Sequence, residues 1–354
     1  MSYFGRDFYT NLAMGGYSNI TKWSKLGYCP IPVTTETDIW SYGATTPVVP
    51  LIVTAATMRV KTNNAADAAT VLFGPTTADG AAGANKTSLV DADVNFSTVE
   101  VGDCVILDKS GTTPAWGYVS DITNKATGTL LVAGGFSNAG GSGGRSYIII
   151  DQNVAVKVGA QAVYIGGLDA NYAQQSEIVL TAGAGPAYTA TIKTWFRINE
   201  FRIISLGTGL KSTDYIALCD GTSTSIYYTF ITAGYNRARN QQYTVPAGKT
   251  LWVTDWNTGF GFVDAAKSQN QYCRLYTRAT QYSSPDNGIN FKTMQSPGVN
   301  LWYPYSEVLL SGGTDTLEFK EPTKFLEKVT LKVSGVASTA GFVTSVLRGY
   351  ITTP

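Results

Sequence analysis

Short runs of alternating apolar and polar residues recur along this chain, and they end at Gly, Pro, Asn and Asp. A period of two places successive side chains on opposite faces of a strand, and helical periodicity is nearly absent. Many short strands between such turns are typical of sandwiches and barrels, so the sequence predicts an all-β fold. Outside residues 71–150, strands are expected over residues 50–61, 153–166, 176–181, 189–204, 213–219, 225–231, 250–257, 272–281, 308–310, 316–320, 328–333 and 342–351.

Residues 1–47 differ from the rest, because they hold many aromatic residues but little strand or helix pattern. Full burial of a large apolar side chain is worth about 1.5–3 kcal/mol, so these rings should be covered. Two interpretations carry similar weight: an irregular segment wrapped on its own domain, and an extended N-terminal arm docked on a neighbouring subunit. The second predicts an arm that serves assembly rather than core stability. Its candidate partner-binding residues are Phe4, Phe8, Tyr9, Tyr17, Trp23, Tyr28 and Trp40.

Residues 71–150 read as an inserted small β-barrel, with glycine-rich stretches at 74–83 and 134–144. Short strands with glycine corners fit such a unit. We expect it to fold autonomously, so that its removal leaves the rest folded. The 134–144 stretch is interpreted as a mobile loop rather than a phosphate cradle, because no Lys-Ser or Lys-Thr pair follows it. The strands of the insert are expected over residues 87–90, 105–107, 116–122, 129–133 and 147–150.

Residues 48–70 and 151–354 are expected to form one antiparallel jelly-roll β-sandwich around the insert. An immunoglobulin-like sandwich is usually shorter, and its Cys…Trp…Cys spacing is missing. Within this region, Asp169 and Glu177 could be considered as a pair of catalytic carboxylates. Their positions in a turn and a strand favour structural roles instead. Arg237 and Arg239 beside Tyr235 could stack bases, yet two arginines normally form a solvated face.

The composition excludes several kinds of chemistry. The chain has no histidine, which rules out Ser-His-Asp and Cys-His triads and His-ligated zinc. The cysteines lack C-x-x-C spacing and read as isolated, reduced thiols. Asp91 and Asp93 lack the glycine and the distal glutamate of an EF-hand, so calcium is not expected there. We therefore predict no enzyme, no cofactor and no metal. The four cysteines are Cys29, Cys104, Cys219 and Cys273.

The charge balance argues against nucleic acid and membrane as partners. Lysine plus arginine is 26 and aspartate plus glutamate is 25, so no global field attracts a polyanion. The start lacks the apolar core of a signal peptide, and no apolar run of about 18 residues occurs. Charged residues make up only 14%, against roughly 25% in an average soluble protein. Such a surface suggests coverage by neighbouring subunits.

Three motifs resemble a family of tailed-phage virion structural proteins of the marine and cyanophage type. They are Gly166–Tyr172 with residues 176–181 and 195–199, then residues 243–250, and residues 26–28 with 35–40 in the arm. The resemblance implies a jelly roll. In such relatives the strand after Asp67 would lead almost directly to residues 161–169, and here residues 71–150 stand between. Residues 99–103 with 116–122 are similar to small barrel inserts of other phage structural proteins.

The resemblance implies a non-enzymatic capsid decoration or cement protein, a closed homotrimer that joins the major capsid protein or neighbouring copies. Its location is then the virion, assembled in the host cytoplasm. One alternative is a tail- or fibre-associated receptor-binding protein for a host glycan, with an aromatic platform. Another is a capsid-forming jelly-roll protein, and a glycan depolymerase has no supporting residue pattern. The platform residues would be Trp252, Trp256, Tyr303 and Tyr305.

Overall fold

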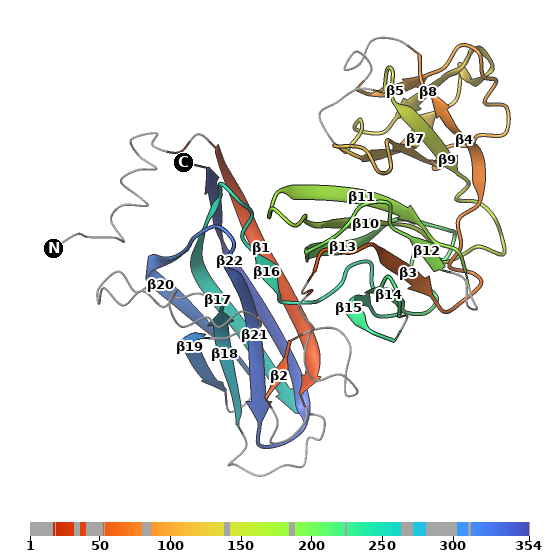
Figure 1. Ribbon diagram of the computed structural model, residues 1–354. Coiled ribbons are helices and arrows are strands. Elements are labelled where there is room, and N and C mark those ends of the chain that lie inside the picture. Colours follow the sequence, from red (N-terminus) through yellow and green to blue (C-terminus); the bar gives the residue numbers. More distant parts are fainter. Residues whose placement is uncertain are drawn as a thin grey trace.

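The chain is nearly all β, as the sequence predicts. Antiparallel sheets account for its architecture, and the single helical element among the described residues is one turn of 3₁₀ helix, η1 (Lys125–Thr127). Figure 1 shows three bodies of strands along the molecule. The computed structural model describes residues 17, 19–31, 36–39, 52, 54–79, 86–137, 142–183, 188–223, 225–262, 272–280, 303–310 and 313–353.

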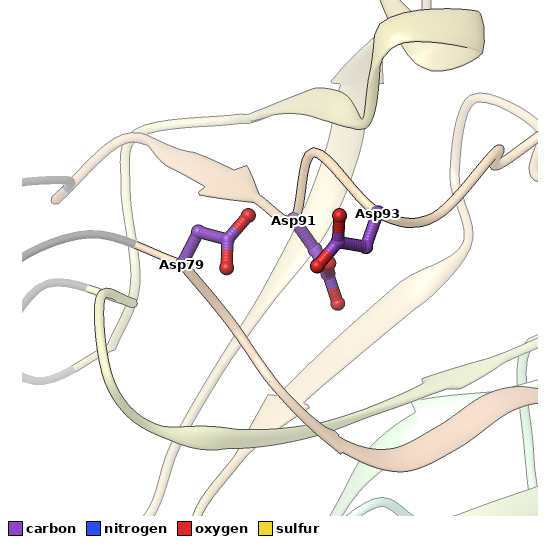
Figure 2. A group of neighbouring side chains, drawn as sticks. All are labelled: Asp79, Asp91 and Asp93. Carbon is purple, nitrogen blue, oxygen red and sulfur yellow. The ribbon is translucent and has the colours of Figure 1, made fainter.

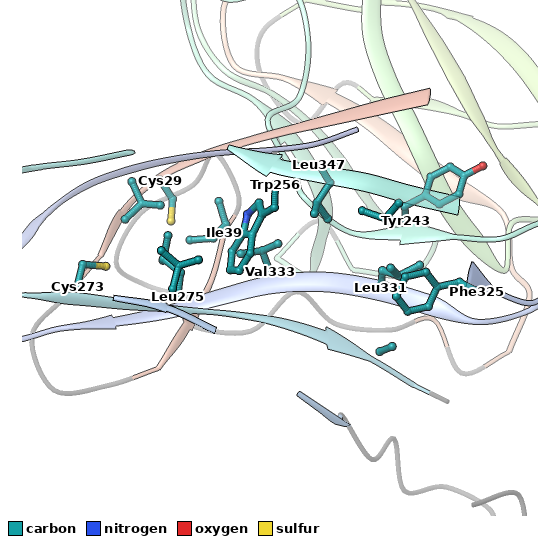
Figure 3. Packing of buried hydrophobic residues seen from close by; sticks show 14 of the residues in the cluster. Cys29, Ile39, Tyr243, Trp256, Cys273, Leu275, Phe325, Leu331, Val333 and Leu347 are labelled. Atoms are coloured by element: carbon teal, nitrogen blue, oxygen red, sulfur yellow. The ribbon is translucent and has the colours of Figure 1, made fainter. Parts of the chain in front are cut away.

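The carboxy-terminal sandwich (residues 19–39 and 241–353) consists of two sheets. One has the order β1 (Asn19–Ile31), β22 (Gly341–Thr353), β17 (Thr250–Phe262) and β20 (Gly313–Phe325). The other has the order β16 (Tyr243–Thr244), β21 (Thr330–Ala337), β18 (Cys273–Ala279) and β19 (Tyr303–Leu310). Apolar side chains from both sheets meet in one core, in which Trp256 and Leu347 face Leu275 and Val333 (Figure 3).

Strand β1 differs from the expected irregular arm. It pairs with β22 without a register shift over all of its 13 residues. Cys29 is buried in the core, and Trp23 packs against that core. The sequence of β1 shows no clear strand pattern because β1 is an edge strand, in which residues such as Lys25, Gly27 and Pro30 are tolerated. This part of residues 1–47 therefore belongs to the sandwich itself, and residues 1–16 lie outside the described residues.

A second, middle sandwich (residues 54–70 and 151–240) has its own core. Its three-stranded sheet has the order β11 (Gln174–Leu180), β10 (Ala160–Leu168) and β13 (Arg197–Leu206). Its four-stranded sheet has the order β12 (Tyr188–Ala190), β3 (Met58–Thr62), β14 (Ile216–Asp220) and β15 (Tyr227–Ile231). Val60, Trp195, Phe201 and Leu218 are among the side chains between these sheets. The residues expected to form one sandwich thus fill two separate cores.

The insert is a six-stranded sheet whose order is β4 (Val71–Thr77), β9 (Ser146–Ile150), β6 (Cys104–Leu107), β7 (Ala115–Asp121), β8 (Thr129–Val132) and β5 (Ser88–Val90). The expected closure into a barrel is not found among its described strands, because β4 and β5 are two separate edges. Pro75 in β4 has no N–H group, and β5 has only 3 residues, so these edges offer few groups for a ladder.

The insert shares a second apolar cluster with the middle sandwich. Strands β6 and β9 are buried on both faces, which explains their unbroken apolar runs. One face packs inside the insert, while Ile106 and Ile148 pack with Ala162, Ile178 and Ile204 of the middle sandwich. This contact argues against the expectation that the insert projects freely.

In the sequence, the insert interrupts the middle sandwich, and the middle sandwich in turn interrupts the carboxy-terminal sandwich. Ile39 donates its N–H to Val333 of β21, and Gln241 then donates its N–H to Ile39 at 3.0 Å. Residues 40–240 thus leave and rejoin the carboxy-terminal sandwich at one point. Similarly, Asp151 donates its N–H to the carbonyl of Thr70 at 2.9 Å, which closes the base of the insert. Each insertion begins and ends at neighbouring backbone groups.

Candidate functional site

The aromatic residues predicted to bind a partner divide into two groups. Tyr17, Trp23 and Tyr28 are described, and each ring contacts an aromatic ring of its own chain: Tyr28 stacks on Phe342 with centroids 5.9 Å apart. Phe4, Phe8, Tyr9 and Trp40 lie outside the described residues. A role in partner binding stays a prediction for all seven.

A cleft of about 590 Å³ lies where the three bodies meet. Its volume is in the range of pockets that hold small ligands, about 300–1,000 Å³. The floor is the outer face of the β11–β10–β13 sheet, one wall is β1, and the insert contributes Thr112 and Thr113. In Figure 1, β1 lies on the side of the carboxy-terminal sandwich that is turned toward the middle sandwich. Such junctions between domains are common places for ligand sites.

The floor of the cleft follows from strand alternation. Ala162, Tyr164 and Gly166 point to the outer face of the sheet, since Val163 and Ile165 fill the inner core. The insert covers the Ala162 end of this face, whereas Tyr164 and Gly166 line the cleft. The glycine keeps the floor open. A Cβ atom at position 166 would lie 3.0 Å from the Tyr164 ring and 3.4 Å from Cβ of Glu200.

The next residue, Gly167, is required for a different reason. A Cβ atom there would lie 2.1 Å from the carbonyl oxygen of Arg197, a backbone atom of the neighbouring strand that cannot give way. The Gly166-Gly167 pair that stands out in the sequence therefore does two things. It lets β10 and β13 approach, and it leaves space above the sheet. The pairing of β10 with β13 is irregular between these two glycines, and the cleft above them was not predicted from the sequence.

Charged groups of the cleft centre on Glu200 and Lys25. Glu200 lies 3.2 Å from both Arg202 and Arg237, and the Arg202 guanidinium also lies over the ring of Tyr164. The ammonium group of Lys25 donates to the carbonyl of Asn199. Burial lowers the pKa of Lys25 to about 8, and the charge of Glu200 opposes this shift. Among the described residues, no carboxylate lies within ion-pair distance of Lys25.

Asp169 and Glu177, which were considered as a catalytic pair, each accept hydrogen bonds from backbone N–H groups. Asp169 accepts the N–H groups of Asn171 and Ala173, at 2.8 and 2.9 Å. Glu177 accepts those of Ile192 and Lys193, at 2.8 and 3.1 Å. Burial raises the pKa of Glu177, while these bonds oppose the shift. Both side chains therefore act in turns and strand connections, as their sequence positions indicate.

Three aspartates of the insert could hold a cation. Asp79, Asp91 and Asp93 bring carboxylate oxygens within 4.8 Å of one another (Figure 2). Oxygen ligands of this kind suit calcium. Two of the side chains already have structural partners: Asp91 accepts the Tyr147 hydroxyl at 2.7 Å, and Asp79 accepts the N–H of Ala92 at 2.6 Å. Sequence reasoning missed Asp79, which lies before β5 and is brought in by the fold.

The arginines near Tyr235 are engaged by their own chain. Arg239 lies 3.7 Å from the centroid of Tyr235 and 5.4 Å from that of Tyr28, and Arg237 reaches Glu200. All four cysteines are buried and free of disulfides. Burial raises the pKa of Cys104, Cys219 and Cys273 to about 12, which makes these thiols poor nucleophiles.

Comparisons with family models, with curated proteins and with solved structures each gave no match. Within the described part of the chain, no helix has the length and apolar character needed to cross a membrane.

Proposed function

We propose that this chain is a non-enzymatic structural protein of a tailed-phage virion, a capsid decoration or cement protein that joins neighbouring copies. The proposal rests on three supports: the motif resemblance, the strand order of the carboxy-terminal sandwich, and an exposed apolar site in the middle sandwich. The last of these carries the argument for assembly.

The strand order supports a jelly roll. Numbered along the chain without the short β2 (Thr37–Asp38), the eight strands of the carboxy-terminal sandwich follow the orders 1-8-3-6 and 2-7-4-5. Two four-stranded sheets in these orders are the arrangement of a jelly roll, a fold of viral capsid domains. The middle sandwich would then interrupt the second strand, since β2 and β16 lie along the same edge of β21. The small barrel expected for residues 71–150 stays a proposal in which β4 and β5 would approach each other.

Leu210 carries the assembly argument. Its side chain is 76% exposed, and its φ of 54° lies in the left-handed region. A branched apolar residue in this conformation costs roughly 1–2 kcal/mol, and its exposure to water stabilises nothing. Val156, which is 72% exposed, lies on an adjoining loop. The two loops are joined by a hydrogen bond from the backbone N–H of Gly209 to the carbonyl of Val158, at 2.9 Å. We take these two exposed apolar residues on adjoining loops as the centre of the surface that a partner would cover.

The occupant that we propose is a second copy of this chain, within a closed trimer. Because only 14% of the residues of the chain are charged, apolar contacts between copies at this surface would meet little electrostatic repulsion. Contact with the major capsid protein would follow through the aromatic residues predicted for it within residues 1–47. Location on the virion, after assembly in the host cytoplasm, is part of the same proposal.

The test is the oligomeric state of purified protein, measured by light scattering during size-exclusion chromatography. Wild type should be a trimer at micromolar concentration. Leu210→Asn should be a monomer whose melting temperature is unchanged or higher, because Asn tolerates the left-handed region. Thr208→Asn, an exposed change in the same loop, should remain a trimer. A monomeric wild type, or a trimeric Leu210→Asn variant, would contradict the proposal.

The cleft favours glycan binding as a second candidate function. The aromatic platform expected for it does not form at two of its residues: Trp252 and Trp256 are buried, and the Trp256 indole N–H bonds to Ser345 inside the sandwich. The side chains of Tyr303 and Tyr305 lie outside the part that the structure describes. A glycan would therefore bind at the cleft rather than at that platform.

A further inference from the structure

We propose that the cleft between β1 and the β11–β10–β13 sheet binds an oligosaccharide that carries a carboxylate, and that Lys25 recognises this carboxylate. The inference rests on the second candidate function, glycan binding at this cleft, and does not depend on the proposed role in assembly. It rests on the geometry of the cleft floor, on the groups that line it, and on the incomplete pairing of Lys25.

The lining suits a sugar better than a peptide. Neutral hydrogen-bonding side chains dominate it, with Gln174, Gln175, Ser176 and Thr112 at the floor and rim. Half-buried Trp23 lines the wall. Sugars present hydroxyl groups to such side chains and apolar ring faces to aromatic ones. A peptide site would be expected to add apolar pockets for side chains, whereas most side chains here are polar.

The excess of cationic side chains in the cleft favours a sugar that carries an acidic group. Among the described residues, Lys22, Lys25 and Arg237 line the cleft with a single carboxylate, Glu200. Glu200 is shared by two arginines, at 3.2 Å each. Lys25 makes one described hydrogen bond, to the carbonyl of Asn199, although an ammonium group can donate three. A bound carboxylate would supply the missing anionic partner.

The incompletely paired ammonium of Lys25 should make ligand binding depend on pH. Burial lowers its pKa to about 8, and the charged groups that act on it are Glu200 and Arg237. Carboxylates and guanidinium groups ordinarily keep their charge between pH 7 and 9, so Lys25 is the group that titrates. A lysine with a pKa of about 8 is roughly nine-tenths protonated at pH 7 and one-tenth protonated at pH 9. An anionic ligand should therefore bind about tenfold more weakly at pH 9.

The experiment is calorimetric titration of the full chain with three acidic probes: trigalacturonate, trimannuronate and sialyllactose. At least one should bind with a Kd below 1 mM at pH 7, and maltotriose should bind at least tenfold more weakly. Lys25→Gln should weaken the acidic probe about tenfold or more and abolish the pH dependence. Lys249→Gln is the matched control, because Lys249 is also half-buried but bonds to Thr353 outside the cleft.

A second variant tests the floor without touching a charge. Gly166→Ala places a methyl group between Tyr164 and Glu200, and it should weaken binding severalfold while the melting temperature shows that the chain is folded. Failure of all three acidic probes to bind would overturn the proposal, as would equal losses in the Lys25 and Lys249 variants. If triglutamate bound as tightly as the acidic sugars, the cleft would recognise carboxylates of peptides as well, and the assignment to a sugar would be overturned.

Discussion

Asp67 joins three loops at the base of the middle sandwich, and its removal should be costly. The side chain is fully buried. One carboxylate oxygen accepts the N–H groups of Ala160 and Thr213, at 2.7 and 3.0 Å, and the other accepts that of Asp214 at 3.0 Å. The carboxylate fits because residue 159 is glycine: a Cβ atom there would lie 2.0 Å from it.

The magnitude follows from these three bonds. A hydrogen bond to a charged group is worth about 1.5–3 kcal/mol, and each buried N–H left without a partner costs about 1–3 kcal/mol. Two of the three amides are partly accessible to water, which reduces the cost. Asp67→Ala should therefore lower the free energy of unfolding of the middle sandwich by about 2–5 kcal/mol. Asp67→Asn, which keeps one acceptor oxygen, should lower it by about 1–3 kcal/mol.

The assay combines calorimetry with hydrogen exchange, because a chain with several cores need not unfold in one step. Exchange should accelerate at the amides of Ala160, Thr213 and Asp214, while the core of the carboxy-terminal sandwich keeps its protection. Asp93→Asn is the control: its side chain is exposed, and the change should stay within about 0.5 kcal/mol. If Asp67→Ala matched Asp93→Asn in stability, the role given to these three bonds would be refuted.

Three further outcomes are expected. Replacing residues 71–150 by a Gly/Ser linker should uncover Ile178 and Ile204, at about 1.5–3 kcal/mol each, so calorimetry should show a weakened middle sandwich beside an unchanged carboxy-terminal one. A chelator should leave the melting temperature unchanged, and a drop that calcium restores would instead assign a cation to the three aspartates of Figure 2. The native thiols should resist an aromatic disulfide reagent at pH 8, because a pKa of about 12 for Cys104 leaves roughly one thiolate in ten thousand; rapid labelling before unfolding would count against this burial.

The strands of the two sandwiches could be predicted because their alternation is local. Residues 342–351 and 250–257, for example, fall within β22 and β17. Strand β1 could not be predicted in this way, since an edge strand with Lys, Gly and Pro carries a weak apolar pattern. Its place depends on a pairing with β22, more than 300 residues away along the chain.

The division into cores was also beyond the sequence. Alternation reports that a strand has a buried face, but not which sheet lies opposite it. Val163 and Leu347 each lie within a strand predicted from the sequence, yet they belong to different cores. The sequence of β6 did contain a usable signal: the four consecutive apolar residues of Cys104–Leu107 indicate a strand that is buried on both faces. That pattern predicts a covered outer face, and Ile178 of β11 lies among the residues that cover it.

The cleft results from the order in which the bodies are nested. A lone middle sandwich would present the face of Tyr164 and Gly166 to water, as an ordinary outer sheet face. The insert, which starts and ends at the Thr70–Asp151 bond, covers one end of this face with Ile106 and Ile148. The return of the chain at Gln241 then sets β1 beside the other end, where the side-chain amide of Gln241 donates to the carbonyl of Lys25 at 3.0 Å. An open sheet face thus becomes a cleft only when both insertions are present. For this reason no local sequence motif could predict the cleft.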